Sequence, residues 1–214
     1  MLNLSQIKRF NGTSWVNITP KRYNGSNWVD AQGYKFDGTK WVNITTQQYT
    51  KTWEATWSQT YRENGARRTD FRGNMLCQGK YADDIWGHMR SLCGFDDADI
   101  RATLSGAKIE KVELYLKNEH WYYYSGGTAI IGYHNHATEP DTFSHSLYNA
   151  KQQKYSSRGQ AQWITMPNSL GEGIRDNKYK GFSIYAGSAS IGYYGVFYGA
   201  NSSYKPKLKI TYSK

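Results

Sequence analysis

Residues 108–116 have the sequence KIEKVELYL, and this stretch decides the fold class. Val112 and Leu114 alternate with Glu113 and Tyr115. Successive side chains of a β-strand point to opposite faces, so one face of this segment is apolar and the other is polar or amphipathic. The stretch therefore predicts a strand with one face on a core.

Similar segments recur after about Lys51. The other strand candidates are the alternating run at 53–61 and the segments 75–81, 90–95, 128–134, 162–166, 181–185, 195–198 and 208–212. Connections rich in Gly, Ser and Asn separate them, at 125–127, 156–159, 171–173 and 200–203. No long helical period competes, and only residues 96–104 suggest a short helical turn. Many short strands at regular spacing predict an all-β, jelly-roll-like β-sandwich over residues 52–214.

The first fifty residues contain a 13-residue repeat. Residues 8–17, 21–30 and 34–43 are KRFNGTSWVN, KRYNGSNWVD and YKFDGTKWVN. Asn-Gly or Asp-Gly between apolar residues is the strongest short-range hairpin signal, because the turn residues must accept positive φ. Residues 1–48 therefore predict an array of three short β-hairpins.

Each predicted hairpin pairs an aromatic ring before the turn with a tryptophan after it. Isolated two-stranded hairpins are marginally stable in water. We therefore expect the repeats to stack on one another, on the main domain or on other chains. The rings expected to serve docking or oligomerisation are Phe10, Trp15, Tyr23, Trp28, Phe36 and Trp41.

Two of the repeats also match the N-glycosylation pattern, at Asn11 and Asn24. The third repeat has Asp37 in the same position. Because aspartate suits a turn but defeats the glycosylation pattern, these positions indicate turn chemistry rather than glycan attachment.

Composition excludes several classes of protein. Eight Trp and 19 Tyr argue against disorder, since disordered chains are poor in aromatic residues. No run of about 18 apolar residues predicts a membrane helix, and the N-terminus lacks the apolar core of a signal peptide. Cys77 and Cys93 are too few for a disulfide scaffold, and the sequence leaves open whether they pair.

The net charge of +10 is spread along the chain. Such charge attracts any polyanion, including DNA, teichoic acid or an acidic capsid surface. No recognition helix, zinc finger or RNP motif is present, so we expect no specific nucleic-acid partner.

Few titratable residues form a chemical signature. His134 and His136 face one way on a predicted strand, with His120 and His145 nearby in sequence, but cysteine partners and tight ligand spacing are missing. We expect no metal and no cofactor. A glycosidase needs two carboxylates across a cleft. The candidates by type are Glu110, Glu113, Glu119, Glu172 and Asp176. No catalytic signature accompanies them, so the sequence predicts a protein without enzymatic activity.

Asp96, Asp97 and Asp99 follow one another closely after Phe95. Calcium prefers such oxygen ligands, but the twelve-residue spacing of an EF-hand is absent. A solvated turn or a helix N-terminus, which favours negative charge, is the preferred interpretation.

The aromatic run that begins at Trp121 carries rings on both faces of a predicted strand, so some rings must lie on the surface or at an interface. Exposed rings stack on sugars or pack against partner proteins. Burial on both faces within an oligomer is the alternative. The candidate glycan-binding residues are Trp121, Tyr122, Tyr123, Tyr124, His134, His136, Tyr193 and Tyr194.

Three segments carry a family resemblance: RSLCGFD at 90–96, LSGAKI at 104–109 and VELYL at 112–116. They resemble the DNRLRE-type domain, a jelly-roll module similar to carbohydrate-binding domains and found in bacterial surface and phage proteins. The hairpin repeats resemble those of minor structural and tail proteins of tailed bacteriophages.

The resemblance implies a bacteriophage virion protein, a tail-tip, fibre or appendage component that contacts host cell-surface glycan. It also implies other virion proteins as partners and a homotrimer. The alternative is a capsid decoration or collar protein with a purely structural role. A wall-associated bacterial adhesin and a hydrolase are further alternatives.

Overall fold

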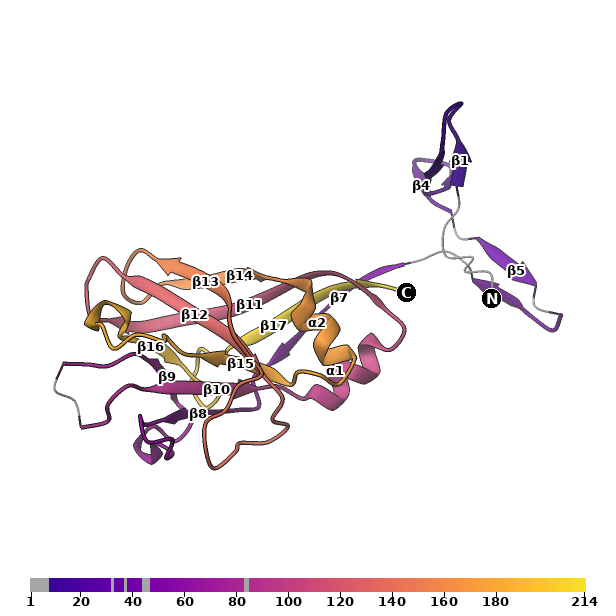
Figure 1. The fold of residues 1–214 in the computed structure, drawn as a ribbon. Coiled ribbons are helices and arrows are strands. Elements are labelled where there is room, and N and C mark those ends of the chain that lie inside the picture. The colour runs from indigo at the N-terminus through magenta and orange to yellow at the C-terminus, as the bar shows by residue number, and fades with distance from the viewer. Residues whose placement is uncertain (1–7, 32, 37, 44–46, 83–84) are drawn as a thin grey trace. The chain divides into compact units, whose positions relative to one another are not determined.

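A computed structural model describes residues 8–31, 33–36, 38–43, 47–82 and 85–214 (Figure 1). The chain divides into two compact units, Met1–Gln48 with Ser213–Lys214, and Tyr49–Tyr212. The second unit begins slightly before the expected start at residue 52, because its first strand already begins at Gln48.

The first unit contains three antiparallel hairpins. They are β1 (Lys8–Phe10) with β2 (Trp15–Asn17), β3 (Lys21–Tyr23) with β4 (Trp28–Asp30), and β5 (Tyr34–Phe36) with β6 (Trp41–Asn43). In each hairpin the aromatic ring and the tryptophan are directly opposite, with ring centroids 5.5–5.6 Å apart. The predicted hairpins and their aromatic pairs are confirmed.

The turns confirm the predicted role of asparagine and correct the predicted geometry. The Asn11 Oδ1 accepts the backbone N–H groups of Thr13 and Ser14 at 3.0 and 2.9 Å. Asn24 makes the same contacts in the second repeat. Gly12 takes a φ of 101°, whereas Asn11 does not take a positive φ. Each of these loops has four residues, so the expectation that both turn residues need positive φ was wrong.

The second unit is a sandwich of two antiparallel sheets. Its strands are β7 (Gln48–Glu54), β8 (Trp57–Tyr61), β9 (Met75–Gln78), β10 (Arg90–Gly94), β11 (Lys108–Trp121), β12 (Gly127–His134), β13 (Leu147–Tyr155), β14 (Ala161–Met166), β15 (Gly181–Ile184), β16 (Gly195–Tyr198) and β17 (Lys207–Ser213). One sheet has the order β13-β12-β15-β10-β8. The other has the order β7-β17-β11-β16-β9, with β14 also paired to β11.

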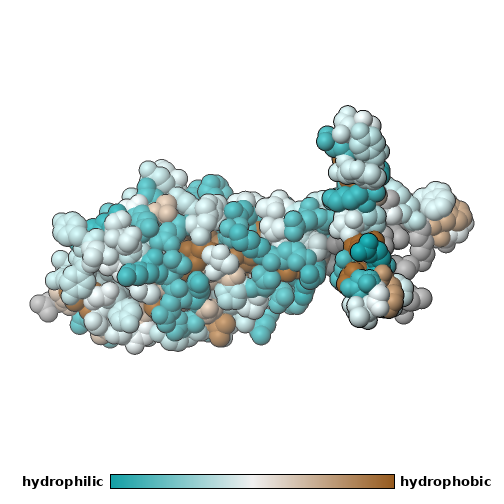
Figure 2. Space-filling view, turned by 90° about the horizontal axis from the view of Figure 1, so that it is seen from above, coloured by the Kyte–Doolittle hydropathy of each residue, from teal (hydrophilic) through white to brown (hydrophobic). Residues whose placement is uncertain are grey.

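The two sheets enclose one large apolar core. From β7 to β12 consecutive strands belong alternately to the six-stranded and the five-stranded sheet. Val112, Leu114 and Leu116 of β11 are fully buried and belong to the same core as Phe182 of β15 in the opposite sheet. The predicted all-β sandwich is confirmed, including the alternation of β11. In the space-filling view the apolar residues of the sandwich appear only as small brown areas among hydrophilic and near-neutral ones (Figure 2).

Two strand predictions were wrong. The run at 53–61 is two strands rather than one, since β7 ends at Glu54 and β8 begins at Trp57 in the other sheet. The edge strand β13 was not predicted at all. Most of its side chains are exposed or half-buried, so its sequence lacks an apolar face.

Two short α-helices, α1 (Asp97–Leu104) and α2 (Asn168–Arg175), pack against each other and contribute Ile100, Leu104, Leu170 and Ile174 to the core. The first was predicted, and the second falls where a glycine-rich connection was expected. A Cβ on Gly173 would lie 2.1 Å from the Tyr179 ring, so glycine here permits close packing rather than a turn.

Cys77 and Cys93 are both buried, and they do not form a disulfide with each other. Short 3-10 turns at Thr69–Phe71 and Ile191–Tyr193 complete the unit.

Candidate functional site

The outer face of the six-stranded sheet carries a line of aromatic and charged side chains along β11. Glu113, Tyr115 and Lys117 alternate with the buried positions of this strand and therefore point away from the core. A register shift between Asn118 and His120 interrupts the pairing with β16, so that Glu119 is exposed and His120 half-buried. This β-bulge therefore extends the row of outward-facing side chains to His120, one residue before the strand ends.

An aromatic pair forms the first part of this line. Tyr115 of β11 lies directly opposite Trp163 of β14, with ring centroids 5.4 Å apart. Trp163 is 43% exposed, and the Lys209 ammonium lies 4.2 Å from its ring. A ring held between a neighbouring ring and a cation loses little entropy when a ligand stacks on it.

A second aromatic pair follows along the strand. Tyr198 at the end of β16 and Tyr204 in the following loop have centroids 4.9 Å apart. The Lys117 ammonium lies 3.3 Å from the Tyr204 ring centroid and 5.4 Å from that of Tyr198. The cation fixes both rings beside the outward face of β11.

A groove with a volume of about 400 Å³ ends the line. Its lining residues are Arg68, Phe71, Met75, Tyr81, Glu119, His120, Tyr194 and Val196. The Tyr194 ring centroid lies 5.1 Å from that of Tyr81 and 5.9 Å from that of His120. Tyr122 reaches the same cluster, 5.9 Å from Tyr81.

We call the whole surface the aromatic track. It consists of Trp163, Tyr115, Tyr198, Tyr204, His120, Tyr194, Tyr81 and Tyr122. From Tyr115 to His120 the strand extends about 17 Å at roughly 3.4 Å per residue. That length exceeds a single sugar ring and suits a chain of several.

A small apolar cluster supports the groove from below. Cys77, Met89 and Val196 are buried there, outside the main core. The Arg68 guanidinium lies 3.8 Å from the Phe71 ring centroid and pairs with a carboxylate of Asp70 at 2.9 Å. Packing and charge pairing therefore hold this wall of the groove in one conformation.

The electrostatics of the track combine neutral and charged groups. Burial and the charge of Arg158 lower the pKa of His120, and the carboxylate of Glu119 only partly opposes them. The ring is therefore neutral at pH 7, with one nitrogen able to donate and the other to accept. Burial raises the pKa of Glu113, but Lys111 and Lys209 together outweigh it and hold that pKa below its usual range.

Two predicted glycan contacts were wrong. Trp121 is 0% exposed and packs between Tyr155 and Phe197, at centroid distances of 5.8 and 5.3 Å. His134 is also fully buried, and its Nε2 lies 2.9 Å from the Cys93 carbonyl oxygen. The register shift between Asn118 and His120 turns Trp121 into the main core. His134 is on the other face of its sheet from core residue Tyr133, where Trp57 and His136 pack against its ring. Neither side chain can touch a ligand.

The other predicted residues separate into different places. Tyr122 and Tyr194 join the track. Tyr123, Tyr124 and Tyr193 are exposed but do not line the groove. Tyr124 is 81% exposed, and the Arg158 guanidinium lies 3.9 Å from its ring centroid.

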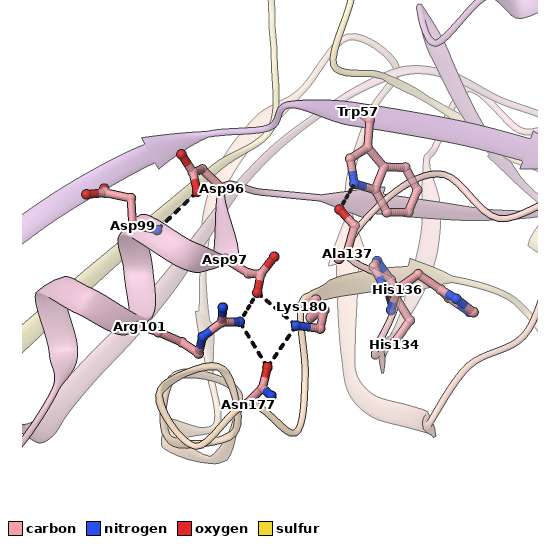
Figure 3. A network of polar contacts seen from close by, with 10 residues as sticks. All are labelled: Trp57, Asp96, Asp97, Asp99, Arg101, His134, His136, Ala137, Asn177 and Lys180. Atoms are coloured by element: carbon pink, nitrogen blue, oxygen red, sulfur yellow. Dashed lines mark hydrogen bonds and ion pairs between the residues drawn. The ribbon is translucent and has the colours of Figure 1, made fainter.

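His136 lies beside His134, near Trp57, and its Nε2 is 2.9 Å from the Ser144 hydroxyl (Figure 3). This pair belongs to the end of β12, in the five-stranded sheet, and not to the track.

Sequence reasoning missed Tyr115, Trp163, Tyr198, Tyr204 and Tyr81 as members of one surface. The outward position of Tyr115 was visible in the alternation of residues 108–116. Its partner strand and the loop that brings Tyr204 were not, because cross-strand register is a tertiary property.

The three clustered aspartates have structural roles, and the Asp99 carboxylate pairs with the Lys51 ammonium at 2.7 Å. Asp96 caps α1, with its carboxylate accepting the N–H of Asp99 at 3.0 Å. Asp97 is paired with Arg101 and with Lys180, the latter at 2.9 Å (Figure 3). Both cations also donate to the Asn177 side-chain oxygen, at 2.9 and 2.8 Å. The helix N-terminus interpretation is confirmed.

Within the described residues, no three His, Cys, Asp or Glu side chains gather where they could hold a metal ion. Nor does that part of the chain contain a helix with the length and apolarity needed to cross a membrane. No protein-family model matches this sequence, and no curated protein matches it either.

The hairpin residues Phe10, Trp15, Tyr23, Trp28, Phe36 and Trp41 are all at least half exposed, with Trp28 and Trp41 at 69%. Large rings so exposed on short strands are unusual for a soluble surface. Their docking role stays a prediction.

Proposed function

We propose that this chain is a non-enzymatic binding protein whose sandwich holds an extended surface glycan along the aromatic track. The observation that carries the proposal is the linear arrangement of rings and charges on the outward face of β11, from Trp163 to Tyr81. Aromatic rings offer flat apolar faces to sugar C–H groups, and adjacent charged and neutral polar groups reach the hydroxyls.

The carboxylate of Glu113, beside the rings of the track, does not support hydrolysis. Glu113 is engaged by Lys111 and Lys209 at 2.9 and 3.0 Å, and its lowered pKa makes it a poor proton donor. A glycosidase needs one carboxylic acid with a raised pKa opposite a second carboxylate. The aromatic track is therefore better suited to binding a glycan than to cleaving it.

The family resemblance extends the proposal to a bacteriophage particle. On this hypothesis the hairpin unit docks on other virion proteins or on copies of the chain through its exposed ring pairs. The sandwich then presents several copies of the track to the host surface, and avidity compensates for weak single-site binding. A capsid decoration or collar protein, with the track covered by a neighbouring protein, is the alternative.

A binding experiment tests the glycan function. The full chain is applied to an array of bacterial surface polysaccharides, and any hit is repeated with the variants Trp163→Ala and Tyr194→Ala. We expect each variant to weaken retention about tenfold, equivalent to about 1.4 kcal/mol. Tyr148→Ala, which removes an exposed ring from β13 of the other sheet, is the matched control and should bind normally.

If all three variants retained the glycan as well as the wild type does, the glycan contact would lie elsewhere and the aromatic track would not be the binding site. Antibody-gold electron microscopy of particles from the source lysate tests the virion hypothesis separately. Label at the tail tip supports host adsorption, and label over the head favours the decoration protein. Absence of label on all particles contradicts a virion location.

A further inference from the structure

A second, polar pocket lies between the start of β8, the segment 67–73 and the loop around residue 139. It has a volume of about 270 Å³. The lining residues are Thr56, Trp57, Ser58, Gln59, Arg67, Thr69, Arg72, Gly73, Glu139 and Asn201. None of them lines the groove of the aromatic track, so the pocket is a separate candidate site.

Hydrogen bonds from several segments fix the floor of this pocket. The Ser58 hydroxyl donates to the Gly73 carbonyl at 2.8 Å and accepts the Ala200 N–H at 2.9 Å. The Asn201 side-chain nitrogen donates to the Arg72 carbonyl at 2.6 Å. A Cβ on Gly73 would lie 2.7 Å from that nitrogen, so only glycine allows this approach. The pocket is therefore preformed rather than a loose gap between loops.

One wall carries a cation whose charge is already balanced. Arg67 donates to the carbonyl oxygens of Pro140 and Glu139 at 3.1 and 2.9 Å. It also pairs with the carboxylates of Glu139 and Asp141 at 3.3 and 3.1 Å. This arginine fastens the loop to the sandwich and is not free for a ligand.

Arg72, in contrast to Arg67, has neither a balancing carboxylate nor a loop to hold within the described part of the chain. Among the residues described by the structure, its guanidinium has no ion pair, hydrogen bond or ring contact. Its backbone is in the left-handed region, with φ 48° and ψ 38°. That conformation is unfavourable for a residue with a Cβ, whereas glycine adopts it freely. An arginine without a fold contact therefore occupies a strained position at the rim of a preformed pocket, as is common at functional sites.

We propose that the pocket binds a single monosaccharide that bears a carboxylate, such as a uronic acid. The planar fork of Arg72 matches a carboxylate through two parallel hydrogen bonds. The side-chain nitrogens of Gln59 and Asn201 are engaged by backbone carbonyls, and their side-chain oxygens, with the Thr69 hydroxyl, are the groups that can accept from sugar hydroxyls. A volume of 270 Å³ is at the small end of ligand sites and suits one ring, not a chain.

The test is a titration of the full chain with galacturonic acid, monitored by two-dimensional NMR. Galactose serves as the uncharged comparison and inorganic phosphate as the comparison for a bare anion. The key variant is Arg72→Gly, which deletes the guanidinium and relieves the backbone strain at the same time. We expect wild type to bind galacturonic acid with a millimolar Kd and at least ten times more tightly than galactose.

Arg72→Gly should weaken galacturonic acid binding at least tenfold while its melting temperature stays equal or rises. Arg72→Lys keeps the charge without the fork and should show an intermediate loss. Arg9→Ala, which removes an exposed arginine from a hairpin, should bind as wild type does. Equal binding by Arg72→Gly and wild type would overturn the proposal. Equal affinity for galacturonic acid and galactose, or displacement by phosphate at the same concentration, would overturn it too.

Discussion

Acidification should destabilise the sandwich through one buried side chain, His134. Its ring lies at the end of β12, fully buried, with Nε2 2.9 Å from the Cys93 carbonyl oxygen. Nδ1 accepts the backbone N–H of His136 at 3.2 Å. Because Nδ1 is an acceptor, the proton of the neutral ring must be on Nε2, which donates to the carbonyl. Both nitrogens are satisfied only while the ring is uncharged.

Adding a second proton at Nδ1 breaks the bond from His136 and places a charge on a fully buried ring that packs against Trp57 and His136. Burial lowers the pKa of His134 to about 4, with the Cys93 carbonyl opposing the shift and the charge of His136 adding to it. The unfolded chain has an ordinary histidine pKa of about 6.5 and so binds more protons between pH 6.5 and pH 4. Stability is therefore complete above pH 6.5 and is lost as the pH falls toward 4. The difference between the two pKa values corresponds to about 3 kcal/mol.

Urea unfolding at several values between pH 7.5 and pH 4 measures this loss. The wild-type free energy of unfolding should fall by about 3 kcal/mol more over this range than that of His134→Gln or His134→Phe. The other histidines with lowered pKa values, His88, His120 and His145, are present in all three proteins and cancel in the comparison. The absolute stability of the two variants does not enter the argument.

Two results would refute this reasoning. One is a pH slope in both His134 variants that equals the wild-type slope. The other is an NMR titration in which the His134 ring protons of the folded protein shift with a midpoint near 6.5. Either result would mean that the ring is accessible to water or that its charge is compensated by a group not in contact with it here.

Three further substitutions test the packing. Trp121→Ala should lower the free energy of unfolding by about 3–5 kcal/mol, because it removes a fully buried ring, and chemical denaturation measures this loss. Gly173→Ala should cost about 1–3 kcal/mol, since its Cβ would lie 2.1 Å from the Tyr179 ring and overpack α2; thermal unfolding checks this. Asp97→Ala should cost about 1–3 kcal/mol, because it removes the carboxylate that faces two cations in a mostly buried network; urea unfolding checks it.

Matched variants control two of these tests. Gly192→Ala adds a methyl group with no neighbour closer than 3.6 Å and should be near neutral, in contrast to the α2 glycine. Asp176→Ala removes an exposed ion pair and should cost less than about 1 kcal/mol. If either control proved as damaging as its partner, local packing and burial would not explain the losses. A Trp121→Ala protein of wild-type stability would likewise contradict the placement of that ring in the core.

The sequence alone determined the features that depend on neighbouring residues. The three hairpins, the turn role of Asn11 and Asn24 and the cross-strand ring pairs followed from a short repeat, because a hairpin is closed by its own turn residues. The alternation in β11 and the short helix capped by Asp96 followed for the same reason. These local signals were enough to predict an array of hairpins followed in the sequence by an all-β sandwich.

The tertiary structure decided which side chains meet, and so the composition of the candidate site. Trp121 and Tyr122 are neighbours in sequence, but strand alternation places one in the core and the other at the groove. Tyr115 meets Trp163 only because β14 pairs with β11 in one register, and a shift of one residue would reverse every face. The helix α2 was hidden because its glycines serve close packing, a role that no local pattern distinguishes from a turn. Cross-strand register and packing distance are set by the whole chain, so the binding surface became visible only once the two sheets were assembled.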